Sequence, residues 1–310
     1  GGRCSVGGLG VGLGPRAPPA AGNVGLGVMT AAESGQVAAP PGGRALALAK
    51  RGAEHALWAR VASQRRLEAR RGTTRPAPTG VLPSAVLQTR DEAKPAVAQA
   101  RRLRLPLHRD RVKNWDALGA VGAVLTLASG EGGLPQRVMD AGSARYSPIL
   151  PWLRLYGVGA TPGGLIGTNL EFGAPVLRDG VVFRYGDVTA TGMPDGHLDA
   201  ITCMSVIEHG VPLAAFLRES ARILRPGGIL VISTDYDYEP PDTRGKVAYG
   251  VPVHIFGPAQ IRALISDAAE VGLDLVGELT DDDLRHPERP CHWERVDLDY
   301  TFILLTFRRR

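Results

Sequence analysis

Short apolar runs alternate with helical patterns along the second two thirds of the chain. Runs with the length of buried strands lie at residues 137–141, 163–170, 181–187, 198–206 and 227–235. Apolar positions recur at helical spacing over residues 111–129, 146–157, 211–224 and 258–272. Strands that alternate with helices pair in parallel through crossovers, and wholly apolar strands are covered on both faces. We therefore predict an α/β domain over residues 111–310 with a mostly parallel sheet.

The end of the chain breaks this alternation. Two strand-like runs, at residues 273–279 and 300–307, follow the last predicted helix, and no second long helix lies between them. Antiparallel strands need only a short connection, whereas parallel strands need a crossover. The pattern predicts an antiparallel pair at one edge of the sheet.

The first 110 residues lack this patterning. Residues 1–43 are mostly Gly, Ala, Pro, Val and Leu, with no period that builds a packed face. Residues 44–71 show a basic helical pattern, which we interpret as a solvated helix or a disordered tail. Residues 72–110 contain several prolines and no sustained pattern, which is typical of a linker. We expect residues 1–110 to be a low-complexity, basic, disordered or linker region before the domain.

Composition limits the classes of function. Residues 1–120 carry 19 Lys and Arg against 7 Asp and Glu, whereas the remaining residues carry 17 against 24, so the predicted domain is mildly acidic. A basic nucleic-acid face on the domain is therefore not expected. The chain has no apolar run of 18 residues and no signal-peptide layout at its start. Its three cysteines (Cys4, Cys203, Cys291) form no CxxC pair, which fits a cytoplasmic protein without a zinc site.

Polar residues and glycines cluster where the predicted strands end. In an open α/β sheet, ligands bind at the carboxyl ends of the strands. Asp140 and Gly142 follow the first strand, where a glycine lets the backbone approach a ligand and an acid can hold an amino group. The next strand ends carry Asn169, then Asp187 with Val188, then Ser205. Each could serve a turn or a cap, and their joint occurrence favours a ligand site.

Four segments resemble the successive motifs of class I S-adenosylmethionine-dependent methyltransferases: RVMDAGSA, LIGTNLE, FRYGDVTATGMPDGHLDAITCMSVIEHG and ARILRPGGILVIST. The resemblance covers about residues 111–310. It implies a Rossmann-like, seven-stranded sheet with a C-terminal antiparallel hairpin, and S-adenosyl-L-methionine as the cofactor. It further implies that Asp140 and Gly142 hold the methionine end and that Asn169 faces the ribose. Asp187 and Val188 would contact the adenine, and Ser205 would lie on the sulfonium side.

The chain departs from the family pattern at two places. Ala144, Arg145 and Tyr146 stand where the first motif usually carries further glycines. Asn169 stands where the second strand usually ends in an acid for the ribose, and Glu171 follows two residues on. An asparagine can bond hydroxyls but lacks the charge-assisted hydrogen bond of a carboxylate. Either Asn169 or Glu171 could therefore contact the ribose.

Two histidines are candidates for a catalytic base. Transfer to a hydroxyl requires a group that removes its proton. His209 follows the fourth strand, and His254 lies in a long loop, residues 235–256, that also carries Asp235 and Tyr249. A cap or a buried packing position would explain either histidine as well. Cys291 and His292 are adjacent and cannot easily share one ion, so we assign no metal.

These observations predict methyl transfer, at an oxygen, to a small molecule or a sugar or glycan acceptor. Three alternatives stay open. A nicotinamide-dependent oxidoreductase would need GxGxxG after the first strand, and DAGSARYS has only the first of these glycines. A non-catalytic adenosyl-binding or scaffold protein would bind a partner. An RNA methyltransferase would use the basic front segment as its RNA arm.

Overall fold

The computed structural model describes residues 43–129, 133–248 and 250–310. Residues Ala47–Arg310 form one compact unit. The prediction for residues 1–43 falls almost entirely outside the described residues. Among the helices that the structure describes, none is both long and apolar enough to cross a membrane.

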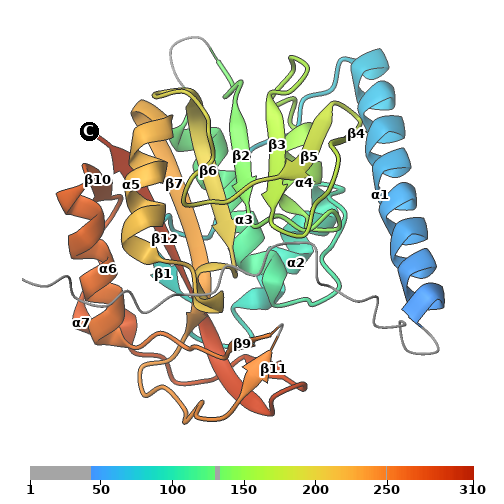
Figure 1. The fold of residues 1–310 in the computed structure, drawn as a ribbon. Coiled ribbons are helices and arrows are strands. Elements are labelled where there is room, and N and C mark those ends of the chain that lie inside the picture. Colours follow the sequence, from blue (N-terminus) through green and yellow to red (C-terminus); the bar gives the residue numbers. More distant parts are fainter. Residues whose placement is uncertain (1–42, 130–132, 249) are drawn as a thin grey trace, which may run out of the picture. The chain divides into compact units, whose positions relative to one another are not determined.

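A twisted sheet runs through the compact unit (Figure 1). Its main path joins β1 (Ala85–Val86), β12 (Leu298–Arg309), β7 (Leu224–Tyr236), β6 (Leu198–Met204), β2 (Val138–Ala141), β3 (Leu165–Asn169), β5 (Val181–Tyr185) and β4 (Val176–Arg178). The neighbouring pairs from β7 to β5 are parallel. β12 pairs antiparallel with both β7 and β10 (Leu273–Leu275). Strands β5, β3, β2, β6, β7, β12 and β10 make the predicted seven-stranded, mostly parallel sheet, so the fold class is confirmed.

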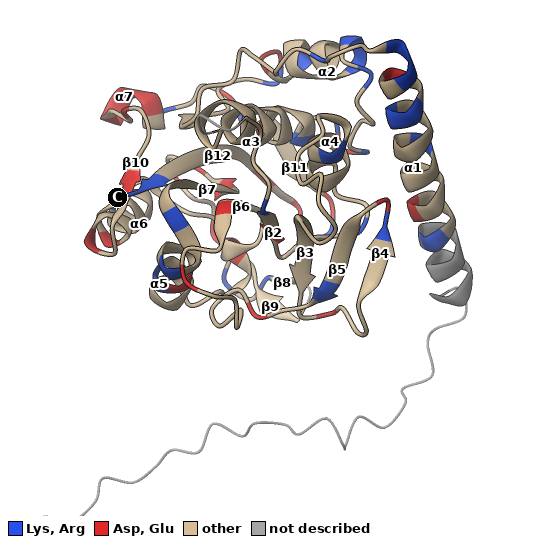
Figure 2. Cartoon of the chain, turned by 90° about the horizontal axis from the view of Figure 1, so that it is seen from above, with Lys and Arg blue, Asp and Glu red and all other residues tan. Residues whose placement is uncertain are grey.

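Helices cover both faces of the sheet (Figures 1 and 2). One face carries α2 (Ala93–Arg102), α3 (Lys113–Leu127) and α4 (Ile149–Leu155), and the other carries α5 (Leu213–Ile223) and α6 (Pro258–Glu270). Trp115 and Trp152 are buried in the core on the first face, and Phe216 and Ile261 in the core on the second. Burying each such side chain stabilises the fold by about 1.5–3 kcal/mol. The amphipathic patterns therefore form helices because each has a sheet face to cover.

Shorter elements extend the carboxyl edge of the sheet. They are η1 (Ile207–His209), β8 (Val247–Ala248), β9 (Val251–Pro252), α7 (Asp281–Leu284) and β11 (Cys291–Trp293). β8 and β9 form a small hairpin, and β11 pairs with the first part of β12. These elements lie below the sheet in Figure 1, beyond the carboxyl ends of the parallel strands.

Residues 72–110 are part of the fold, which differs from the linker that we expected. β1 pairs antiparallel with β12, and the Leu87 N–H donates to the Phe302 carbonyl at 2.9 Å. α2 packs against α3 through buried Ala96 and Ala100. A two-residue strand gives no periodic signal, and the flanking prolines conceal it. The free edge of β12 supplies the backbone partners that the sequence does not show.

The basic helix α1 (Gly43–Arg71) also packs, which differs from the solvated or disordered helix that we expected. Trp58 and Val61 are buried, and the Trp58 ring meets the Phe183 ring edge-on at a centroid distance of 5.8 Å. The Arg178 side chain of β4 pairs with Glu54 at 3.0 Å. Lys and Arg mark the solvent side of α1 in Figure 2. The apolar stripe was too narrow to predict packing, and the sheet rim at β5 and β4 supplies its partner.

Replacing Ser84 should show that the segment before α2 stabilises the domain. The buried Ser84 hydroxyl donates to the Val276 carbonyl at 2.9 Å and accepts from the Thr306 N–H at 3.1 Å. Ser84→Ala leaves both backbone groups without this partner, so we expect a loss of about 1–3 kcal/mol in the free energy of unfolding, measured with urea. Thr126→Ala removes an exposed hydroxyl and should stay within about 0.5 kcal/mol. If Ser84→Ala lowered the free energy of unfolding by no more than about 0.5 kcal/mol, as expected for Thr126→Ala, the Ser84 hydroxyl would not stabilise the sheet.

Candidate functional site

Four parallel strands, β6, β2, β3 and β5, lie side by side and end at the same edge of the sheet (Figure 1). Asp140 lies in β2 and Gly142 follows it, Asn169 ends β3, Asp187 follows β5, and Ser205 follows β6. The structure therefore brings all five of these predicted residues to one edge. Their individual roles stay predictions.

Asp140 is enclosed between two neighbouring strands. Its carboxylate is buried and accepts a hydrogen bond from the Thr202 hydroxyl of β6 at 2.7 Å. Burial raises the pKa of Asp140 to about 6, although hydrogen bonds from Ser143 and Thr202 favour the charged form. A group this far inside the edge holds the adjoining loop and carries negative charge beneath it at neutral pH.

The loop after β2 approaches its neighbour too closely for a side chain. Gly142 has a φ of +71°, and a Cβ built there would lie 2.4 Å from the Val206 side chain. Asn169 ties this loop to β3, because its amide nitrogen donates to the carbonyls of Gly142 and Ser143 at 3.3 and 3.1 Å. The Asn169 side-chain oxygen accepts from the Glu171 N–H at 2.9 Å.

This arrangement explains why an amide stands at position 169. Two carbonyl oxygens face the side chain and require a donor, which an ionised carboxylate does not have. Asn169 therefore supports the loop from below, and its polar groups are engaged with the backbone. Glu171, two residues further on, is exposed.

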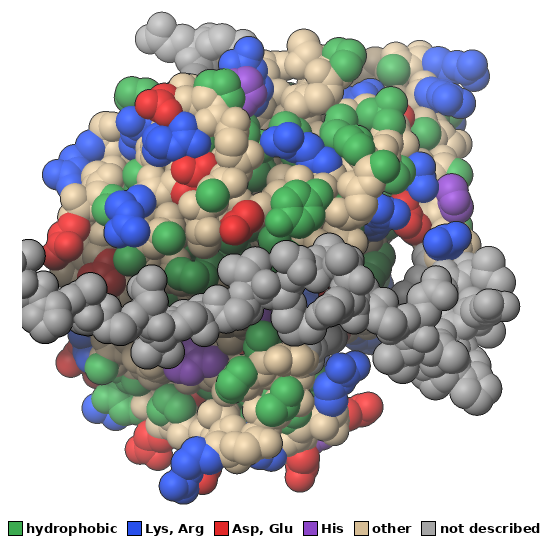
Figure 3. Space-filling view, viewed as in Figure 1, with side chains coloured by type: hydrophobic (Ala, Val, Ile, Leu, Met, Phe, Trp, Pro, Cys, Tyr) green, Lys and Arg blue, Asp and Glu red, His purple; other side chains and the backbone are tan. Residues whose placement is uncertain are grey.

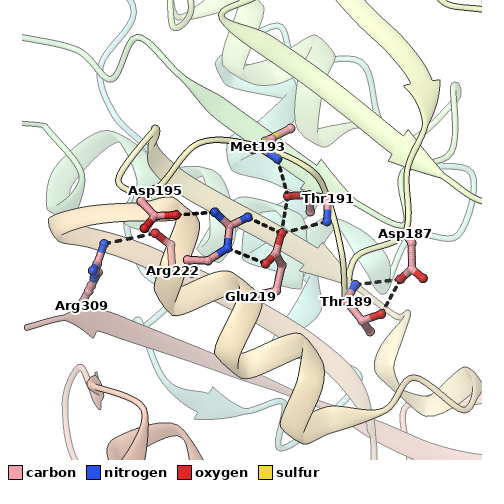
Figure 4. A network of polar contacts seen from close by, with 8 residues as sticks. All are labelled: Asp187, Thr189, Thr191, Met193, Asp195, Glu219, Arg222 and Arg309. Atoms are coloured by element: carbon pink, nitrogen blue, oxygen red, sulfur yellow. Dashed lines mark hydrogen bonds and ion pairs between the residues drawn. The ribbon is translucent and has the colours of Figure 1, made fainter.

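Asp187 starts a turn that a second network holds in place (Figure 4). Its Oδ1 accepts from the N–H and hydroxyl of Thr189 at 2.8 and 2.7 Å, and Val188 packs against the core. Farther along the loop, Thr191 donates to Glu219 of α5, which also pairs with Arg222. The Arg222 guanidinium and the Thr191 hydrogen bonds lower the pKa of Glu219 to about 2. The loop after β5 is thereby fixed to α5 by a charged anchor.

Ser205 has a strained backbone and an ammonium partner. Its φ is +53°, which is uncommon for a residue other than glycine. The Lys113 ammonium donates to the Ser205 hydroxyl at 2.7 Å and lies 4.7 Å from the centre of the Phe302 ring. Non-glycine residues in such conformations concentrate at functional sites. Sequence reasoning missed Lys113 and its neighbour Asp116, although two charges inside a buried apolar helix were a signal.

Both predicted catalytic histidines lie beyond the carboxyl ends of β6 and β7. His209 ends η1, directly after β6, and its ring meets the Trp293 ring edge-on at 6.4 Å. His254 precedes Phe256, whose backbone bonds to Asp235 and Asp237 at the end of β7. Burial lowers the pKa of His254, and burial together with Lys113 lowers that of His209. Both rings are therefore neutral near pH 7 and chemically able to accept a proton.

The other loop residues that we considered are placed unevenly. Gln260 lies 3.1 Å from His254 Nε2 and fixes that ring, and Asp235 is buried at the end of β7. Tyr249 lies outside the described residues. Cys291 is buried, whereas the next residue, His292, is partly exposed and contacts Asp299 at 2.9 Å. The two side chains point to opposite faces of β11, as adjacent residues of a strand do.

One cleft lies next to Asp237, just beyond the end of β7. It has a volume of about 630 Å³, and its lining includes Arg90, Arg289, Asp237 and His286. Asp237 is itself paired with Arg289. None of the predicted site residues lines this cleft, so its position does not bear on their roles.

Part of the chain that includes this edge is similar to known proteins. Residues 139–232 match the model of a family described as a methyltransferase domain. A probable S-adenosylmethionine-dependent methyltransferase of Mycolicibacterium smegmatis is 39% identical over 54 residues, 17% of this chain and 21% of that protein. A ubiquinone biosynthesis O-methyltransferase of Pseudomonas paraeruginosa is 34% identical over 61 residues, 19% of this chain and 26% of that protein. The chain thus matches about a quarter or less of the length of these relatives.

Several solved structures are similar to this chain over most of their own length. One of them is a geranyl diphosphate C-methyltransferase of Streptomyces coelicolor A3(2), solved with Mg²⁺, geranyl diphosphate and S-adenosyl-L-homocysteine. The similarity covers 80% of this chain and 98% of that one, with 15% identity and a TM-score of 0.44.

Replacing Gly142 tests how closely the loop after β2 packs on the loop after β6. Gly192 is a matched control, because its φ is +68° and no heavy atom lies within 4 Å of a Cβ built there. Gly192→Ala should cost about 1 kcal/mol of unfolding free energy, the penalty of the left-handed backbone alone. Gly142→Ala should cost at least about 1 kcal/mol more, because Val206 must move. Equal costs in urea unfolding would show that the two loops do not pack as described.

Proposed function

We propose that this chain, a class I S-adenosyl-L-methionine-dependent methyltransferase, transfers a methyl group to the hydroxyl of a small-molecule, sugar or glycan acceptor. One observation carries the proposal. The loops after β2, β3, β5 and β6 meet at a single sheet edge, and the family match over residues 139–232 spans all four of them. An oxidoreductase interpretation lacks support, because Ala144 and Ser147 stand where the GxGxxG motif of a nicotinamide site, counted from Gly142, needs its further glycines.

The residues at the edge fit an adenosyl cofactor. Gly142 keeps the loop after β2 free of a side chain, and the buried Thr168 hydroxyl at the end of β3 has no hydrogen-bond partner among the described residues. We assign Asp140 and Gly142 to the methionine end. We assign Asp187 and Val188 to the adenine and Ser205 to the sulfonium side.

The ribose contact belongs to Glu171 in this proposal. The Asn169 amide nitrogen donates to the carbonyls of Gly142 and Ser143, and its side-chain oxygen accepts from the Glu171 N–H. It therefore orients Glu171, whose exposed carboxylate can accept hydrogen bonds from two hydroxyls. The family pattern puts the acid that bonds the ribose at position 169, and in this proposal Glu171 makes that charge-assisted hydrogen bond instead.

His209 or His254 removes the acceptor proton in this proposal. The cofactor supplies an electrophilic methyl group on sulfur, so the chain must align the acceptor oxygen and take its proton. Both rings lie at the edge beyond β6 and β7, and burial keeps both neutral near pH 7. A neutral imidazole is the protonation state that a general base requires.

The distribution of charge favours a small acceptor over a nucleic acid. The edge holds the acids Asp140, Asp187, Glu208 and Asp235, whereas α1 carries its Lys and Arg at the β4 rim, away from β6 and β7 (Figure 2). On the face shown in Figure 3, Lys and Arg are interspersed with acidic and apolar side chains. A phosphate backbone is recognised by a continuous basic surface. The relatives' names, which include a ubiquinone biosynthesis O-methyltransferase, support the same class of acceptor.

Replacing Asp187 tests the cofactor site. Asp187→Ala removes the proposed acceptor for the adenine amine and the turn bonds to Thr189, so we expect S-adenosylhomocysteine to bind at least about tenfold more weakly by calorimetry. Asp242→Ala removes an exposed acid that pairs with Arg244 and should leave the dissociation constant unchanged. An unchanged constant for Asp187→Ala would remove this residue from the site.

Replacing the histidines tests the base. Either His209→Ala or His254→Ala should lower turnover by about 100-fold or more, with nearly unchanged affinity for S-adenosylhomocysteine. Turnover is followed as tritium transfer from labelled cofactor into fractionated metabolites and glycans of the source organism. His55→Ala, at an exposed position of α1, serves as the control. Full activity of both variants would mean that the acceptor needs no base from these positions.

A further inference from the structure

A buried cluster of ionisable side chains lies directly beneath Ser205. Lys113 and Asp116 come from α3, Glu208 from η1 and Asp235 from β7. Backbone and hydroxyl contacts join the cluster to the strand ends. The Ser205 N–H donates to the Ser233 carbonyl at 2.8 Å, and the Ser233 hydroxyl donates to Asp116 at 2.9 Å. The cluster is thus part of the same edge as the proposed cofactor site.

Glu208 and Asp235 form a pair of carboxyl groups inside this cluster. Their exposed fractions are 2% and 3%, and the negative charge of Asp235 raises the pKa of Glu208. The Thr234 hydroxyl donates to Glu208 Oε2 at 3.0 Å, whereas Glu208 Oε1 has no hydrogen-bond partner among the described residues. Lys113 faces three acids, Asp116, Glu208 and Asp235. With all three ionised, the buried cluster would hold an uncompensated negative charge, so the Glu208–Asp235 pair holds a proton instead. Burial raises the pKa of Asp235 to about 7 and that of Glu208 well above its usual range.

Several elements face this pair. Two charges lie on α3. The Lys113 ammonium attracts the pair, whereas the Asp116 carboxylate repels that of Asp235. Tyr300 of β12 also faces Asp235 and favours its charged form. Burial and the pair raise the pKa of the thiols of Cys203 in β6 and Cys291 in β11, so both stay neutral near pH 7. Lys113 is therefore the positive charge that the fold supplies, set against Asp116 and the acid pair.

We propose that the Glu208–Asp235 pair is the counter-charge for the sulfonium of the cofactor. The pair gives up its shared proton when the cationic cofactor binds and regains a proton once the methyl group has been transferred. This inference rests on the proposed function, and it concerns how the site distinguishes the cofactor from the spent product. The sulfonium would add a second positive charge to that of Lys113 and so favour ionisation of the pair. The effect is strong because charges interact more strongly in a buried environment of low polarity.

The charge balance of the reaction fits this role. Transfer breaks the carbon–sulfur bond, whose electron pair stays on sulfur, and forms a carbon–oxygen bond on the acceptor. The acceptor hydroxyl releases its proton, and the positive charge on sulfur disappears. One positive charge is lost at the edge as one proton becomes available there. The histidine that accepts this proton can pass it to the pair, which thereby returns to the protonated state that it had before the cofactor bound.

Calorimetry on the full chain tests the proposal without turnover. Binding of S-adenosylmethionine and of S-adenosylhomocysteine is measured at pH 7 in two buffers of different protonation enthalpy, which gives the number of protons released. We expect the methylated ligand to release more protons than the demethylated one, by up to one proton. Glu208→Gln and Asp235→Asn should each remove this difference. Each should also lower the preference for the methylated ligand by on the order of tenfold.

Asp199→Asn is the matched control for loss of one negative charge. Asp199 lies at the opposite end of β6 and pairs with Arg225 at 2.6 Å. This variant should keep the wild-type difference in proton release. Glu208→Gln retains an oxygen for Thr234, so the test does not depend on Asp235→Asn folding.

Two outcomes overturn different claims. Equal proton release for the two ligands, or a difference that survives in a folded Glu208→Gln chain, would rule out the pair as counter-charge. A wild-type chain that binds neither ligand would instead overturn the proposed function.

Discussion

The parallel register of β6, β2 and β3 is the constraint on which the candidate site depends. Asp140 stands opposite Thr202 on one side and Gly167 on the other. This register puts the Thr202 hydroxyl within hydrogen-bond distance of the buried carboxylate. A slip of one residue would turn Asp140 to the other face and leave both groups without partners. The apolar residues around them fix the register, because each strand is covered on both faces.

The loops beyond this register hold one another through backbone groups. Gly142 lies against Val206, and Asn169 bonds the carbonyls of Gly142 and Ser143. The loop after β5 is fixed separately, by the contact of Glu219 with Thr191. Loops tied in this way pre-organise a ligand site, since little conformational freedom is left to lose on binding. The departure at Asn169 thus has a structural reason, because an amide can donate to the carbonyls of a neighbouring loop that a carboxylate would repel.

The buried charges at the edge lower the stability of this fold. Apolar residues of similar volume could be buried there at a lower desolvation cost than Lys113, Asp116, Glu208 and Asp235. They occupy the layer directly under Ser205, whose backbone is itself strained. Buried charges and strained backbone that occur together are typical of functional sites, where residues are kept for function although they lower the stability of the fold.

The sequence by itself determined the fold class and the order in which the polar loops follow the strands along the chain, and it supplied the candidate residues. The reason is that the alternation of apolar strands and amphipathic helices is strong and regular from residue 111 onward. Because parallel strands end at one edge, the sequence alone predicts that Asp140, Asn169 and Asp187 lie together. These inferences need only periodicity and the position of each residue at a strand end.

Tertiary structure alone decided how the front segment and the buried charges are used. β1 pairs with β12, and α1 buries Trp58 against Phe183. The sequence pattern of neither segment predicts these contacts. The direction of the Asn169 amide and the meeting of Glu208 with Asp235 were equally beyond the sequence. Such contacts join residues distant in the chain, and their energy depends on burial and on neighbours that only the folded chain brings together.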